Sequence, residues 1–331
     1  MRKGQREEWV DRVRGLCMMA ILLFHTENYY AGEEIIPYAL YVDNVLIAFF
    51  FISGYLIHRN GTPFSYQKKM SAIVRSILLP YFIFTTIIAI PKVLIREETT
   101  FSETVWGILT GHASWFVAAL AVAEILFASM LHLFKERICP LAVTSCVSFF
   151  LVALAYHFID NDLLEQHNYW CFQNALLMLP FIFMGYAFRR NNKWQEWFNR
   201  RRNILFFVYL LAIIKGIVHA EGMTLTLQPI HVSTFLILLV DGLTGTVLLI
   251  ALCKWMSSKR LMQYIGKHSI IYYFICGGVP FLVTRALTRV GFPYENLYLL
   301  IILAFILVVL ITTGITYLIC SFPQKVWKNR G

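Results

Sequence analysis

The sequence predicts an all-α fold, a polytopic bundle of about ten transmembrane helices with both termini in the cytoplasm. Hydrophobic residues make up 58% of the 331 residues, and charged residues only 15%. Soluble domains hold roughly 45–50% apolar and about 25% charged residues. A soluble core has no use for so many apolar side chains, whereas a chain surrounded by lipid does. Long apolar runs and an uneven distribution of basic residues support the same fold class.

The apolar runs are separated by short polar gaps, and several approach the ~20 residues that a helix needs to cross ~30 Å of hydrocarbon. The seventh run is short and holds Lys215 near its end. We expect a single membrane-embedded domain over residues 1–331, with no appended soluble domain. The predicted spans are Val13–Tyr30, Tyr38–Ile57, Ile73–Leu94, Trp115–Phe134, Leu141–Phe158, Trp170–Phe188, Ile204–Val218, Val232–Cys253, Ser269–Leu287 and Tyr298–Phe322.

The basic residues predict the orientation of these spans. When the N-terminus is placed inside, nearly all of the 29 Lys and Arg residues fall in inside segments, and the exceptions are Lys92, Arg96, Lys215, Arg285 and Arg289. Such a bias marks the cytoplasmic side of a membrane. Acidic residues, among them Glu27, Glu33 and Glu34, are expected in the outer loops. Membrane topology therefore explains the net charge of +10, and no nucleic-acid partner is expected.

The first predicted span carries two polar residues, Arg14 and His25, eleven positions apart. On a helix, eleven steps end about 20° past three full turns, so the two side chains share one face, ~16 Å apart along the axis. This separation suits a long cofactor such as coenzyme A, whose charged head stays at the cytoplasmic mouth while its reactive end reaches inward. His25 is a natural proton acceptor for an attacking hydroxyl. The alternative is a histidine that hydrogen-bonds a neighbouring helix, with Arg14 as a topology anchor.

Other spans also contain polar residues. Ser53 and Gly54 combine a polar group with close backbone approach, a pattern that also fits ordinary helix packing. Glu124 is either a functional acid or a buried partner for a histidine or arginine. Asp241 is expected to be paired or neutral, because a buried carboxylate is costly. The nine histidines show no HxxxH or HExxH spacing, so no metal is expected.

Together these features resemble the acyltransferase-3 family of integral-membrane O-acyltransferases. Its first-span pattern, Arg-x10-His after an Asp, is matched by Asp11, Arg14 and His25. Its second-span pattern, Phe-Phe-x-Ser-Gly-Phe/Tyr, is matched by the run Phe50–Tyr55. Looser matches follow in the expected order, at Lys68, Lys69, Arg75 and Pro80, at Trp115-Phe116 with Glu124, at Phe183-Met184-Gly185-Tyr186, and at Gly266-Lys267-His268-Ser269.

The resemblance implies transfer of an acyl group, most often acetyl, from cytoplasmic acyl-CoA to a hydroxyl of a cell-surface or lipid-linked carbohydrate. Acetyl-CoA is then the expected donor, membrane lipids are expected neighbours, and the cytoplasmic membrane of a bacterium-like cell is the expected location. His25 would act as a general base or as a transient acyl acceptor. Arg14 and Arg75 would hold the CoA phosphates, since a guanidinium makes bidentate phosphate contacts. The residues expected to line the substrate cavity are Ser53, Tyr55, Trp115 and Glu124.

One position departs from the family pattern. The Gly-Lys-Asn-Ser segment often continues to a histidine about seven residues after the serine, and here Cys276 stands in that place. A second histidine therefore has no role here, or a different one. The competing class is a proton-coupled transporter, in which His25, Glu124 and Asp241 would form a proton relay. A further alternative is a translocation module that uses the same intramembrane polar residues. The sequence leaves the sugar and the oligomeric state open.

Overall fold

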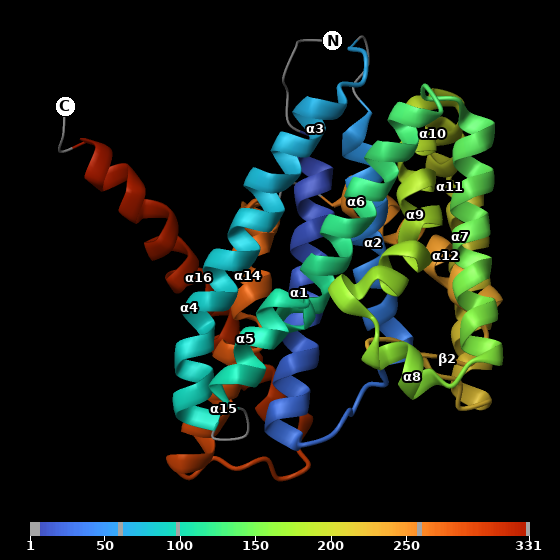
Figure 1. The fold of residues 1–331 in the computed structure, drawn as a ribbon. Coiled ribbons are helices and arrows are strands. Elements are labelled where there is room, and N and C mark those ends of the chain that lie inside the picture. Colours follow the sequence, from blue (N-terminus) through green and yellow to red (C-terminus); the bar gives the residue numbers. More distant parts are fainter. Residues whose placement is uncertain (1–6, 59–61, 97–99, 257–259, 329–331) are drawn as a thin grey trace. The chain divides into compact units, whose positions relative to one another are not determined.

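The computed structural model describes residues 7–58, 62–96, 100–256 and 260–328, and their regular structure is almost entirely helical, which confirms the predicted fold class (Figure 1). The chain divides into two compact units. Unit 1 comprises Met1–Val45 and Leu249–Gly331, and unit 2 comprises Leu46–Leu248. Part of the predicted charge asymmetry lies outside the described residues, at Arg2, Lys3, Arg6, Arg59, Lys259 and Arg330.

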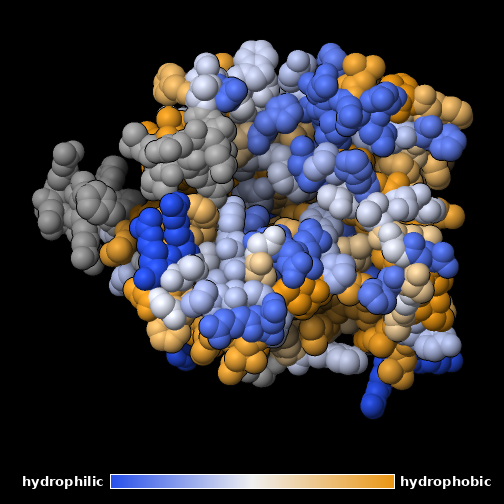
Figure 2. Space-filling view, turned by 90° about the horizontal axis from the view of Figure 1, so that it is seen from below, coloured by the Kyte–Doolittle hydropathy of each residue, from blue (hydrophilic) through white to orange (hydrophobic). Residues whose placement is uncertain are grey.

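Among the described residues, eight helices are long and apolar enough to cross a membrane. A bent pair, Ser269–Ile275 and Gly278–Arg289 with 48° between them, makes a ninth candidate. Helix α1 (Glu8–Ala31) coincides with the first predicted span but is not among the eight, since its apolar run is interrupted by polar residues. The ten-span topology stays a prediction. Figure 2 shows hydrophilic residues gathered on the end of the molecule that carries helix α8 (Asn161–Gln166), with hydrophobic residues at the margin.

Unit 1 is built around α1, which packs against four other elements of the unit. The unit also holds the first residues of α2 (Tyr38–Ile57) and the last residues of α12 (Phe235–Trp255). Its remaining helices are α13 (Arg260–Lys267), α14 (Ser269–Ile275), α15 (Gly278–Arg289) and α16 (Tyr298–Lys328). The partners of α1 include α13, α15 and α16.

The contact between α1 and α13 depends on two glycines. A Cβ at Gly15 would overlap the carbonyl oxygen of Met262, and a Cβ at Gly266 would overlap the carbonyl oxygen of Asp11. Small residues at such crossings let helix backbones approach closely. The Gly266 position of the Gly-Lys-His-Ser segment is therefore required by packing against α1.

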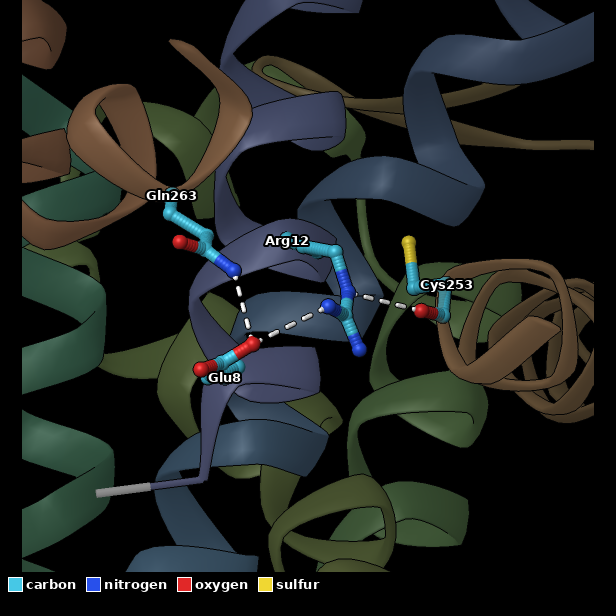
Figure 3. A network of polar contacts seen from close by, with 4 residues as sticks. All are labelled: Glu8, Arg12, Cys253 and Gln263. Carbon is cyan, nitrogen blue, oxygen red and sulfur yellow. Dashed lines mark hydrogen bonds and ion pairs between the residues drawn. The ribbon is translucent and has the colours of Figure 1, made fainter. Parts of the chain in front are cut away.

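Polar contacts tie the N-terminal end of α1 to its neighbours (Figure 3). The guanidinium Nε of Arg12 donates to the Cys253 carbonyl at 2.9 Å, in the last turn of α12. Carbonyls in a last helical turn lack partners within the helix, so Arg12 serves as a cap. Glu8 accepts bonds from Arg12 at 3.4 Å and from Gln263 of α13 at 3.0 Å. Arg12, which the charge pattern explains only as a topology residue, thus joins α1 to α12, and Glu8 joins α1 to α13.

The other end of α1 differs from the sequence expectation. Glu27 was expected in an outer loop, but α1 continues to Ala31 and ends at Gly32, whose backbone is left-handed. Glu27 is fully buried and accepts a hydrogen bond from the hydroxyl of Tyr298 in α16. The sequence does not show that Glu27 is buried, because its hydrogen-bond partner Tyr298 comes from a distant helix.

Unit 2 contains the remaining elements of the described chain, including most of α2 and of α12. Its short helices α3 and α10 and its hairpin β1–β2 stand between longer helices along the chain. In chain order they are α3 (Tyr66–Ile73), the π-helical turn η1 (Val74–Leu78), α4 (Leu79–Arg96), α5 (Phe101–Leu109), η2 (His112–Ser114), α6 (Trp115–Leu133), α7 (Ile138–Phe158), α8, η3 (Tyr169–Cys171), α9 (Phe172–Arg190), α10 (Asn192–Asn199), α11 (Arg201–Ala220), β1 (Leu225–Leu227) and β2 (Ile230–Val232).

Helices α2 and α9 cross with their backbones in contact. A Cβ at Gly54 of α2 would overlap the Ile182 carbonyl oxygen, and a Cβ at Gly185 of α9 would overlap the Phe51 carbonyl oxygen. The sequence segments that carry these two glycines, Phe50–Tyr55 and Phe183–Tyr186, are thus the two sides of one crossing.

The hairpin formed by β1 and β2 is antiparallel, and its Leu227 carbonyl accepts a hydrogen bond from the Asn174 amide of α9.

The crossing generates a stability prediction. Gly54→Ala is expected to lower the free energy of unfolding by about 1–3 kcal/mol, because the added methyl group must displace backbone atoms of α9. Gly216→Ala in α11 is the matched control, since no atom lies within 4 Å of a Cβ built there. Thermal unfolding of the purified variants measures both. Equal melting temperatures for Gly54→Ala and Gly216→Ala would contradict the crossing.

Candidate functional site

Arg14 and His25 both lie on α1, which is an unbroken helix over the interval between them. Both side chains are half-buried. The imidazole of His25 stacks on the Tyr29 ring at 6.1 Å, and Tyr29 meets the Phe281 ring of α15 edge-on at 5.5 Å. His25 therefore contacts an aromatic side chain that packs within unit 1.

Unit 2 brings together two predicted site residues, Ser53 of α2 and Glu124 of α6. The hydroxyl of Ser53 donates a hydrogen bond to Oε1 of Glu124. The other carboxylate oxygen, Oε2, lies 2.6 Å from Nζ of Lys69 in α3. Ser53 and Glu124 are buried, with 4% and 8% of their surface exposed, whereas the Lys69 side chain is 20% exposed. Three helices thus contribute one residue each to a compact polar network.

Tyr55, one helical step beyond Gly54, is also buried. Its hydroxyl accepts a hydrogen bond from Arg189 of α9, and the Arg189 guanidinium lies 4.7 Å from the centre of the Tyr55 ring. A cation held against an aromatic face and bonded to its hydroxyl is strongly constrained. The Tyr55 side chain therefore bonds a residue of α9, whereas the Ser53 side chain bonds Glu124 of α6.

Trp115 and Glu124 both belong to α6 but are far apart along its axis. It begins α6, nine residues before Glu124, which corresponds to ~13 Å along the helix axis. Its ring is half-buried and meets the neighbouring Phe116 ring edge-on at 5.8 Å. Phe116 in turn packs on Phe49 and Phe50 of α2. Of the four residues predicted to line one cavity, the structure joins Ser53 and Glu124 directly and separates Trp115 from them.

Arg75 lies in an exposed groove of about 580 Å³ on unit 2. The groove follows one face of α3 and continues onto the π-helical turn. Its lining combines two cationic side chains with two hydroxyls and an amide, a chemistry that suits an anion. The lining residues are Gln67, Lys68, Ser71, Ala72, Arg75 and Ser76.

The π-helical turn has a local cause in the sequence. Pro80 has no amide hydrogen, so it cannot donate to the carbonyl of Ser76 as an α-helix requires. The Leu79 amide instead bonds the carbonyl of Val74, five residues earlier. Ser76 hydrogen-bonds the Ala72 carbonyl through its side chain at 2.7 Å. This widened turn places Arg75 and Ser76 together at the end of the groove, and such turns recur at functional sites.

The carboxylate of Asp241 in α12 is fully buried and lies 2.7 Å from Nζ of Lys215 in α11. The expectation that Asp241 is paired is thus met by a lysine from a neighbouring helix. Lys215 is one of the few basic residues that the predicted topology does not place in an inside segment. Its ion pair with the buried Asp241 explains its position in α11.

Two contacting residues were not among the predicted site residues. Lys69 stands in the basic pair Lys68-Lys69, which the charge pattern explains as topology, and Arg189 ends α9 in a similar basic pair. Helical phase offers a signal for Lys69, because it shares a face with Tyr66 and Ile73. Tyr66 packs on the His132 ring of α6 at 5.1 Å, and Ile73 is buried. Lys68 lies about 100° around the helix from Lys69, on the groove-lining face.

Comparison with known protein families gives one match, to the family of acyltransferase-3 domains, described as an acyltransferase domain, over residues 7–320. The match covers nearly the whole chain. The chain belongs to this family. No curated protein and no solved structure matches. Membership makes the chain a membrane acyltransferase in general terms. The matched residues include all of unit 2, most of unit 1 and every predicted site residue of this acyltransferase.

The buried ion pair of this acyltransferase generates a second prediction. Lys215→Met is expected to destabilise the protein by about 3–5 kcal/mol, because it leaves a carboxylate buried without its counter-charge. The double variant Lys215→Met/Asp241→Leu is expected to recover most of that loss, since no charge then remains. Thermal unfolding in detergent measures both. A double variant as unstable as the single one would show that the pairing is not what Lys215 contributes.

Proposed function

We propose that this acyltransferase transfers an acetyl group from cytoplasmic acetyl-CoA to a hydroxyl of a cell-surface or lipid-linked carbohydrate. The observation that carries the proposal is the arrangement on α1, where Arg14 and His25 occupy one continuous helix inside a family of acyltransferases. The charged head of the donor stays near Arg14 at the cytoplasmic end. The reactive centre lies at the level of His25, deeper in the membrane. The acceptor approaches from the outer side.

His25 acts on the acceptor hydroxyl. An imidazole with a pKa near neutrality takes up a proton as the hydroxyl attacks the thioester carbonyl. The alternative role, a transient acyl carrier, uses the same nitrogen as a nucleophile. In either role the ring must be held in one orientation, and the stack with Tyr29 supports that requirement.

The groove on α3 supports the donor assignment. Arg75 and Lys68 supply two positive charges, and Ser71 and Ser76 supply hydroxyl donors within the same groove. This set matches the phosphates of a nucleotide, which accept bidentate bonds from guanidinium groups. The residues proposed to line the substrate cavity remain Ser53, Tyr55, Trp115 and Glu124. Of these, Trp115 lies ~13 Å from Glu124 along the axis of α6.

A proton-coupled transporter has less support. Such a relay needs buried carboxylates that exchange protons during a cycle. Here Asp241 lies against Lys215, and Glu124 lies against Lys69, each at ion-pair distance. A carboxylate that is neutralised by a lysine has its charge balanced without a proton.

The direct test is acetylation of cell glycans. His25→Ala is expected to lower the acetyl ester content by at least about 10²-fold, the usual contribution of a general base. The control is His219→Ala, because His219 is an exposed histidine at the end of α11. Both variants must reach the membrane in equal amounts. Full acetylation with His25→Ala would remove His25 from the mechanism. Absence of acetyl esters with the wild type would remove the proposed reaction.

The groove gives a separate prediction for the donor. Arg75→Ala is expected to raise KM for acetyl-CoA roughly tenfold or more with kcat little changed, because a charge-assisted phosphate contact is lost. The control is Arg201→Ala, which removes an exposed arginine of α11. S-acetyl-pantetheine, which lacks the phosphates, is expected to react equally with the wild type and with Arg75→Ala. A similar KM change with both donors would show that Arg75 does not contact phosphate.

A further inference from the structure

Four exposed rings gather at one place on unit 2, although they come from two distant parts of the chain. Trp106 belongs to α5 and His112 begins η2, whereas His167 follows α8 and Tyr169 begins η3. The centre of the Tyr169 ring lies 6.4 Å from the centre of each of the other three rings and meets each of them edge-on. Trp106 and Tyr169 are 60% and 46% exposed, and both histidines are exposed as well. We call these four residues the aromatic platform.

The backbone beneath the platform is fixed where its two parts meet. A Cβ at Gly111, whose φ is +90°, would lie 2.6 Å from the Cα of Trp170. The Trp170 amide donates to the Thr110 carbonyl at 2.6 Å, and its ring packs on Tyr81 and Phe82 of α4. Trp170 itself has a φ of +55°, which is costly for a residue with a side chain. Such a conformation persists only where the surroundings hold it, and it recurs at binding sites. The platform is therefore preorganised.

Both histidines of the platform have one ring nitrogen defined by a neighbour. Nδ1 of His167 lies 2.8 Å from the Leu163 carbonyl oxygen, which can only accept, so this nitrogen carries the hydrogen. The hydroxyl of Thr110 donates its one hydrogen to the Trp106 carbonyl at 2.7 Å. Thr110 therefore accepts from Nδ1 of His112, which lies 2.9 Å away. In each neutral ring Nε2 is then a hydrogen-bond acceptor.

The charges near the platform do not suit a phosphate ligand. No lysine or arginine occurs in residues 97–134 or 138–188, the two stretches that supply the four rings. Anionic lipid headgroups and nucleotide phosphates are held by lysine and arginine. A neutral ligand rich in hydroxyl groups fits this surface better, because it needs no counter-charge. The acidic residues of the two stretches close to the platform in sequence are Glu103, Asp160, Asp162 and Glu165.

We propose that the aromatic platform binds the acceptor saccharide. A sugar ring has a face of C–H bonds that packs on the electron-rich face of an aromatic ring. Its rim of hydroxyl groups donates hydrogen bonds to acceptors such as the two Nε2 atoms. Trp106 and Tyr169 supply the flat contact area, and such rings lose little conformational entropy on binding. This inference rests on the proposed acyl transfer to a carbohydrate and names the surface that receives it.

The position of the platform agrees with the direction from which the acceptor comes. All four rings belong to unit 2, in residues 95–114 and 159–169, which the predicted topology places outside. The 3₁₀ turn η2 ends at Ser114, directly before Trp115, a proposed cavity residue at the start of α6. Figure 2 shows hydrophilic residues gathered on the end that carries α8, which suits a surface in contact with water. A saccharide on the platform thus lies beside the outer end of α6.

The test is saccharide binding to the full-length protein in lipid nanodiscs. The probe is the glycan of cells that make this protein, released by mild acid and freed from acetyl esters by mild base. Binding is measured without acetyl-CoA, and KM for the same glycan is then measured with acetyl-CoA. Trp106→Ala is expected to weaken binding and to raise this KM about threefold to tenfold, the loss of one aromatic contact. The KM for acetyl-CoA is expected to stay unchanged.

Further variants separate the ring contact from the hydrogen bond and from folding. Trp106→Phe keeps an aromatic ring and is expected to bind the glycan better than Trp106→Ala. His112→Phe keeps a flat ring without Nε2 and is expected to weaken binding about threefold to tenfold, the loss of one hydrogen bond. The control is Phe158→Ala, which removes a 77% exposed ring at the C-terminal end of α7. It is expected to bind like the wild type. Membrane content and melting temperature are compared for every variant.

The outcomes are distinct. Weaker glycan binding with Trp106→Ala but not with Phe158→Ala supports the proposal. Equal binding by the wild type and Trp106→Ala, or no binding by the wild type, overturns it, and the proposed function stands if cell glycans still gain acetyl esters. Equal losses of membrane content with Trp106→Ala and Phe158→Ala would make the rings a membrane-interface belt and also overturn it. Binding that depends on Trp106, with no acetyl ester on any glycan, removes the proposed reaction and leaves the saccharide site supported.

Discussion

Contact between the backbones of α2 and α9 at Gly54 and Gly185 sets the geometry on which the polar site of unit 2 depends. Helices normally stay apart by the width of their side chains, roughly 8–10 Å between axes. Two facing glycines remove that spacing, and each opposes a carbonyl group of the other helix. Ser53 and Tyr55 flank Gly54, so their directions follow from this contact. Tyr55 then meets Arg189 of α9, while Ser53 is directed toward α6.

Charge balance is the second constraint on the interior of this protein. A membrane interior offers little solvation for an unpaired charge, so ionisable groups there need partners. Glu124 has Lys69, Asp241 has Lys215, and Arg12 bonds the end of α12 and Glu8. Each of these contacts joins residues from different helices or from different turns of one. The same groups that make burial costly therefore also define how the helices are arranged.

The fold class could be read from the sequence because lipid exposure changes composition over the whole chain, and no single contact decides it. Helix positions followed from the same apolar runs, and the glycines of the motifs mark real crossings. The partners of individual polar side chains could not be predicted in this way. Lys69 and Arg189 stand in basic pairs that topology already explains, and their partners lie 55 and 134 residues away along the chain. Glu27 resembled a loop residue because Tyr298, which bonds it, belongs to α16.

The widened turn between α3 and α4 has a consequence for how this chain can change. A π-helical turn holds one residue more than the α-helical turn that it replaces, so it shifts the angular phase of everything beyond it by about 100°. The groove face of α3 and the apolar surface of α4 are aligned only with that extra residue in place. Loss of a single residue from Val74–Leu78 would rotate one helix against the other without breaking either. The alignment of the groove face of α3 with the apolar surface of α4 is thus determined by chain length at a single turn.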